Sequence, residues 1–89
     1  MATILKLKGT EAACATVTGS ASTFGSATCV RLINTGVAAH LVTLEQTDGT
    51  DIGTITIAVG ETVYLKKNPT DQIFAANAGV LGVGVSLEG

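Results

Sequence analysis

The sequence predicts a small all-β domain, either an antiparallel β-sandwich or a partly open barrel of about eight short strands. Three observations favour this class. Thr, Val and Ile make up 29 of the 89 residues, and their branched Cβ favours extended backbone over helix. Apolar and polar residues alternate over several short stretches, which is the period of a half-buried strand. Turn-forming residues interrupt these stretches about every 8 to 12 residues, as in sandwiches and small barrels.

The N-terminal part predicts one clear strand, one weak strand and a loop. Residues 3–8 alternate leucines with lysines, which predicts a half-buried strand. Residues 11–18 are rich in Ala and Thr and predict a weaker strand. Residues 19–27 are rich in Ser, Thr, Gly and Ala and predict a loop, with Phe24 as its main apolar anchor.

The middle of the chain predicts two strands joined by a turn. Residues 28–33 alternate, so that Val30 and Leu32 face one way and the residues between them face the other. Asn34-Thr35-Gly36 is composed of turn formers and ends this strand. A second strand follows over residues 38–46.

The C-terminal half predicts four more strands, over residues 52–58, 62–67, 72–76 and 80–88. Asp48-Gly49 predicts a hairpin before the first of them, because glycine accepts the positive φ that such turns require. In that strand Gly53, Ile55, Ile57 and Val59 share a face opposite Thr54 and Thr56. Gly60-Glu61 turns the chain into the next strand, where Val63 and Leu65 face inward and Tyr64 and Lys66 outward. Asn68-Pro69-Thr70-Asp71 ends that strand.

The last strand supplies the candidate interface. We expect its leucines and valines, Leu81 to Leu87, to face inward and the glycines between them to face outward. A bare backbone lets another chain approach closely, so this face is a candidate contact with a neighbouring subunit. The alternative is that an aromatic ring of the same chain, such as Tyr64 or Phe74, covers the glycines. The candidate interface residues are Gly82, Gly84, Ser86, Tyr64, Lys6 and Lys8.

Composition excludes several classes of partner. Only 13% of residues are charged, the net charge is −2, and five Lys plus Arg do not form a basic footprint for nucleic acid. The uncharged stretch 73–87 is shorter than the roughly 20 residues of a membrane helix and is interrupted by glycines. Lys6 and Lys8 interrupt what would be the apolar part of a signal peptide, so we expect synthesis in the cytoplasm. A small, weakly charged domain with few aromatics favours a homo-oligomer.

Residues with reactive side chains are few and scattered. His40 is the only histidine, so the partner for a metal site is missing, and a catalytic role would need Ser or Cys brought beside it by the fold. Cys14 and Cys29 favour two small half-buried thiols, with a single disulfide between them as the alternative. The Asp48–Asp51 stretch lacks the further carboxylates of a calcium loop. We therefore expect no catalytic, cofactor-binding or metal-binding residues and no enzymatic activity.

Two segments resemble small virion proteins of tailed bacteriophages, especially those of marine and cyanobacterial hosts. The segments are Val30-Arg31-Leu32-Ile33-Asn34 and Gly60-Glu61-Thr62-Val63-Tyr64-Leu65-Lys66-Lys67-Asn68-Pro69-Thr70-Asp71. The similarity extends over about residues 28–76. It implies a β-sandwich that decorates or cements the capsid surface, as trimers bound where major capsid proteins meet. It implies no catalytic residues.

The resemblance and the composition together predict a non-enzymatic virion structural protein, most directly a capsid decoration or cement protein. The alternative is a small carbohydrate- or surface-binding sandwich module, including one associated with a phage tail or fibre. Sugar-binding modules usually present aromatic platforms, and one Tyr with two Phe is a small supply of them.

Overall fold

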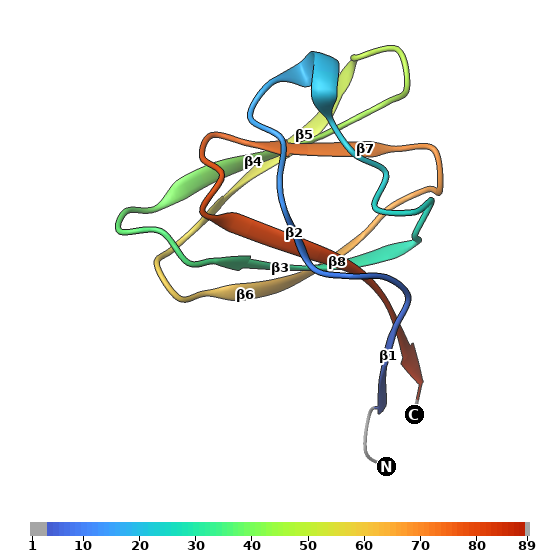
Figure 1. Ribbon diagram of the computed structural model, residues 1–89. Coiled ribbons are helices and arrows are strands. Elements are labelled where there is room, and N and C mark those ends of the chain that lie inside the picture. Colours follow the sequence, from blue (N-terminus) through green and yellow to red (C-terminus); the bar gives the residue numbers. More distant parts are fainter. Residues whose placement is uncertain (1–3, 89) are drawn as a thin grey trace.

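The computed structural model describes residues 4–88, and their strands form two antiparallel sheets (Figure 1). The larger sheet has the order β1 (Ile4–Leu7), β8 (Val80–Glu88), β3 (Cys29–Asn34) and β6 (Thr62–Lys66), with β2 (Ala12–Ala13) also paired to β8. The smaller sheet has the order β5 (Asp51–Ile57), β4 (His40–Glu45) and β7 (Gln72–Ala75). The sheets do not close into a barrel, so the predicted all-β sandwich of eight short strands is confirmed among these residues.

Seven of the predicted strands end within two residues of the observed ones. Thr3, the first residue of the predicted N-terminal strand, lies outside the residues that the structure describes. The strand predicted over residues 11–18 is too long, since β2 stops at Ala13. There the chain leaves the larger sheet and crosses to the smaller one, where the carbonyl of Ala15 accepts a hydrogen bond from the backbone N–H of Ala75 (2.9 Å).

The core lies between the sheets and is aliphatic. Val30 and Leu32 of β3 are fully buried, and the residues between them are half-buried, so the alternation predicted for this strand is confirmed. Val63 and Leu65 of β6 pack against the same cluster. The buried members of the cluster are Cys14, Ala27, Val30, Leu32, Val42, Ile57, Ile73, Ala75 and Val80.

Asn34 fixes the end of β3 to the crossover, the loop that leads from β3 in the larger sheet to β4 in the smaller one. Its side chain is fully buried. Nδ2 donates hydrogen bonds to the carbonyl oxygens of Ala38 (2.9 Å) and Ile57 (2.8 Å), and Oδ1 accepts one from the N–H of Gly36 (2.9 Å). One amide therefore fixes the turn predicted at this point and also joins it to β5 in the other sheet.

The segment between β2 and β3 closes one side of the sandwich. After Ala15, the short 3-10 turn η1 (Thr18–Ser20) lies over the smaller sheet, and Ser22 then forms a bridge to Ile73 of β7. In Figure 1 this blue-to-cyan segment rises from the larger sheet to the smaller one. The free edge of β7 and one flank of the core are covered in this way.

Glu45 is a buried carboxylate beneath η1. It is fully buried, and its Oε2 accepts a hydrogen bond from the hydroxyl of Thr18 (2.6 Å). The other oxygen, Oε1, is buried with no hydrogen-bond partner among residues 4–88. The Thr18 hydroxyl is thus the side-chain donor that compensates this carboxyl group for its lost hydration.

Replacing Thr18 by Val should destabilise the protein by about 1.5 kcal/mol, because the shape is kept and the donor to a buried carboxylate is removed. Urea unfolding measures this loss, and the exposed Thr16→Val is the control, for which we expect no change. Equal stability of the two variants would show that Glu45 does not depend on Thr18.

Candidate functional site

The two glycines of the predicted interface lie inside the sandwich, so their proposed exposure is wrong. Gly84 pairs with Val30 and Gly82 with Leu32, and residues paired across neighbouring strands share a face of the sheet. Both partners belong to the core. A Cβ built on Gly82 would lie 2.8 Å from Cε1 and Cζ of Phe24, and one built on Gly84 would lie 2.9 Å from the carbonyl oxygen of Phe24.

A ring of the same chain does cover Gly82, as in the alternative, but the ring is Phe24 and not Tyr64 or Phe74. The loop anchor predicted at Phe24 thus packs on the glycine that was predicted to be bare. The misassignment arose because both faces of β8 are well covered. Val83 and Val85 are buried although they lie on the outer face, where the side chain of Arg31, opposite Val83, pairs with Glu11 (3.3 Å).

The other predicted interface residues are accessible, and they lie on or beside the larger sheet. Lys6 and Lys8 are exposed, and Lys6 pairs with the half-buried Ser86. Tyr64 is 49% exposed on the outer face. An open hollow of about 410 Å³ brings Tyr64 and Ser86 together, and we call it the outer hollow. It is lined by Thr28, Cys29, Tyr64, Lys66, Val85, Ser86 and Leu87.

Beside the outer hollow, β1 and the end of β8 form a two-stranded ribbon that projects from the sandwich (Figure 1). Leu5 pairs with Leu87 and Leu7 with Val85, so these four aliphatic side chains share one face. Leu7 is 64% exposed. A ribbon with this much exposed apolar surface is typical of a contact with another protein.

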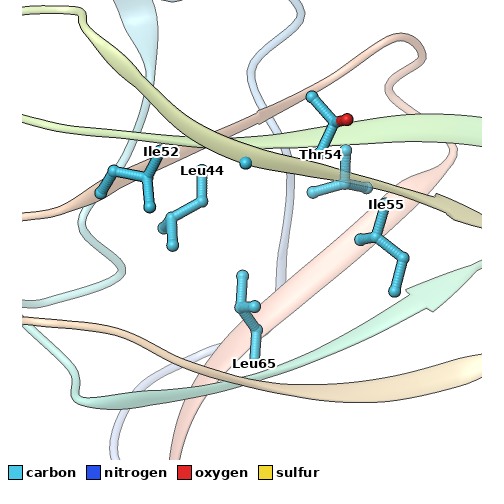
Figure 2. A pocket seen from close by; sticks show the side chains of 7 residues that line it. Leu44, Ile52, Thr54, Ile55 and Leu65 are labelled. Atoms are coloured by element: carbon cyan, nitrogen blue, oxygen red, sulfur yellow. The ribbon is translucent and has the colours of Figure 1, made fainter.

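Sequence reasoning missed an apolar groove on the open side of the sandwich. It lies between β5 of the smaller sheet and β6 of the larger one and has a volume of about 190 Å³. Figure 2 shows Leu44, Ile52 and Ile55 pointing toward Leu65 across it, whereas Thr54 points away. The groove is lined by Val42, Leu44, Ile52, Gly53, Thr54, Ile55 and Leu65.

The groove exists because β5 and β6 are both edge strands. Within residues 4–88, β5 pairs with β4 alone and β6 with β3 alone. Residues 51–56 are therefore exposed throughout, including Ile52 (49%) and Ile55 (45%). A β-bulge at Leu44/Glu45 leaves Ile52 as an extra residue at the end of the groove. The sequence places Ile55 on the inner face, but nothing in it indicates that this face is left uncovered.

Among the residues with reactive side chains, Cys29 lines the outer hollow, whereas Cys14 is buried in the core and Asp48 lies in a turn. Cys14 and Cys29 are free thiols rather than a disulfide, and burial raises the pKa of Cys14 to about 11. Asp48 accepts a hydrogen bond from the backbone N–H of Thr50 (2.9 Å), and this bond lowers the pKa of Asp48. The Asp48–Gly49 turn predicted from the sequence is confirmed, with φ of +90° at Gly49.

Across residues 4–88, no group of three or more His, Cys, Asp or Glu side chains is placed to hold a metal ion. Over the same span, no helix is long and apolar enough to cross a membrane.

Comparisons with protein-family models, with curated proteins and with solved structures found no match to this chain.

Proposed function

We propose that this protein is a non-enzymatic structural protein of a bacteriophage virion. It acts at the capsid surface as a decoration or cement protein and binds at joints between major capsid proteins as a homo-oligomer. The resemblance of residues 30–34 and 60–71 to small phage virion proteins supports this assignment. The trimer is favoured by that resemblance alone.

The observation that carries the proposal is the apolar surface that the fold leaves uncovered. The ribbon, the outer hollow and the groove expose aliphatic side chains over one sheet and one open edge. Surfaces of this kind on a weakly charged domain are typical of proteins that function by binding other proteins. Repetition by capsid symmetry multiplies many weak contacts into firm attachment.

The outer hollow is the surface we assign to the capsid. Tyr64 lines it with an apolar ring and a hydroxyl group, a combination that is enriched at the centres of protein interfaces. Lys66 adds one positive charge beside it, whereas Cys29 and Leu87 supply the accessible apolar part. Interfaces of standard size combine these same components.

Mass spectrometry of purified particles of the encoding phage tests the function. We expect the protein in the particle at a high, symmetry-related copy number, and we expect cryo-electron microscopy to place it on the head. Its absence from the particle, or sugar binding by the isolated protein, would reject the proposal and favour the carbohydrate-binding alternative. Placement on the tail or fibre would reject the capsid assignment.

Replacing Tyr64 by Ser should weaken co-sedimentation with undecorated capsids by about tenfold or more, as for a central aromatic in an interface. The melting temperature should change little, because the side chain is about half exposed. The control is Val37→Ser, which removes a fully exposed aliphatic side chain from the loop between β3 and β4. Equal capsid binding by both variants would exclude the outer hollow as the docking surface.

A further inference from the structure

The open side of the sandwich presents two unpaired strand edges with an apolar groove between them. No strand within residues 4–88 pairs with the outer edge of β5, and the inner residues of β5 and β6 lie on either side of the groove. Such an edge is a template for the addition of another strand. The opposite side is closed by the segment that joins β2 to β3, so the exposure is specific to the β5–β6 side.

The same chain carries a strand suited to that edge. Within residues 4–88, β1 pairs with β8 alone, so its outer edge is also free. β1 belongs to the ribbon that projects from the sandwich, and a projecting ribbon can reach a second molecule (Figure 1). Leu5 and Leu7 are exposed on one face of it, and Lys6 is exposed on the other.

The alternation of β1 matches the two faces of β5. The inner face of β5 carries Gly53 and Ile55 in the groove, whereas its outer face carries Thr54 and Asp51, because these residues pair with Thr43 and Glu45 on the outer face of β4. A β1 strand added to this edge with Leu5 and Leu7 inward places Lys6 outward, on the face of β5 that bears Asp51.

Charge near the groove is complementary to the lysines of β1. β5 carries one acidic residue and no basic one, and Asp48 lies in the adjoining turn. Asp48 and Ile52 line a second, polar hollow of about 350 Å³. Acidic groups therefore lie beside the apolar groove, whereas the β1 segment and the residue after it carry Lys6 and Lys8.

We infer that the occupant of the groove is the β1–β8 ribbon of a second copy of this chain. The edge of β1 adds to the edge of β5, Leu5 and Leu7 enter the groove, and Lys6 lies beside Asp51. The groove volume is adequate, since a cavity of roughly 150 Å³ accepts a benzene-sized group. The contact joins two different surfaces, so repetition of it forms a closed ring when the rotation between copies permits.

This inference names the surfaces through which the proposed homo-oligomer forms, and it rests on that part of the proposed function. It does not depend on capsid binding. Sedimentation velocity of the isolated protein across concentrations is the first measurement. We expect reversible association of the wild type, and at least about tenfold weaker association of Leu7→Ser, which removes an apolar group at a contact. Val37→Ser is the matched control and should associate as the wild type does.

A second variant fills the groove itself. It keeps the inference testable even if Leu7→Ser fails to fold. A Cβ on Gly53 meets no atom within 4 Å, so Gly53→Leu can fill the groove with a side chain of its own. We expect it to melt no earlier than the wild type and to associate at least about tenfold more weakly. A wild type that stays monomeric, or a folded Gly53→Leu variant that associates normally, would overturn the inference.

Disulfide cross-linking between two variants, each with a cysteine on a different surface, identifies which two surfaces meet. Leu7→Cys and Ile55→Cys are prepared in a Cys29→Ser background, and Cys14 is left in place because burial and its raised pKa make it unreactive. After mixing in air, where dissolved oxygen oxidises the paired thiols, a disulfide should join the two different variants. A disulfide confined to Leu7→Cys pairs would indicate ribbon-to-ribbon contact and overturn the inference. The capsid experiments decide the proposed function separately, since a protein can form this ring without binding a capsid.

Discussion

Asn34→Asp is expected to lower the free energy of unfolding by about 3 to 5 kcal/mol, the cost of leaving a buried charge without a partner. The Nδ2 group donates to two carbonyl oxygens, and the substitution replaces it with an oxygen that repels both. Small domains are stable by only about 5 to 15 kcal/mol, so a large part of the stability is lost. Chemical unfolding followed by circular dichroism measures the effect.

Asn77→Asp is the matched control. Asn77 is exposed, and its Oδ1 accepts a hydrogen bond from the backbone N–H of Gly79 (2.7 Å), which a carboxylate oxygen can accept equally well. We expect a change within about 0.5 kcal/mol, as for most surface substitutions. Similar stability of the two variants would mean that the two bonds from Nδ2 do not hold the crossover.

Gly82→Val should lower the free energy of unfolding by about 3 kcal/mol, near the upper end for overpacking a core. The added Cβ alone would lie 2.8 Å from two ring atoms of Phe24 and 3.0 Å from Cδ2 of Leu32. Thermal melting in dilute solution measures the loss. Gly53→Val is the control, since it also adds a branched side chain to a strand glycine but meets open space.

A double-mutant cycle assigns the cost of Gly82→Val to the Phe24 ring. Phe24→Ala makes room for the new side chain, so the double variant should be more stable than the sum of the two single losses predicts. Strict additivity would contradict a direct contact between the ring and position 82. Wild-type stability of Gly82→Val would instead restore the exposed face that the sequence suggested for Gly82.

The strands could be predicted because their signals are local. The alternation of Val30 and Leu32, the Asp48–Gly49 turn and the outward Tyr64 each depend on neighbouring residues, and each is found where it was predicted. Phe24 was recognised as an anchor for the same reason. Local signals of this kind set the position of strands and turns with little help from the rest of the fold.

The faces of β8 and the groove could not be predicted because both depend on topology. Alternation in β8 shows two faces without showing which is inner, and Val83 and Val85 are buried on the outer one. The placement of Gly82 follows only from its pairing with Leu32. The groove likewise requires β5 and β6 to be edge strands of different sheets, although they follow one another in the chain.

Amide hydrogen exchange at increasing protein concentration tests most directly whether the open side is an interface. In the monomer, the outward-pointing amides along β5 and β1 should exchange quickly, since no strand within residues 4–88 pairs with these edges. We predict that protection of residues 4–7 and 51–57 rises together as sedimentation reports association, while Val37 in its exposed loop stays unprotected. Association without new protection in β1 and β5 would contradict the account and place the interface elsewhere.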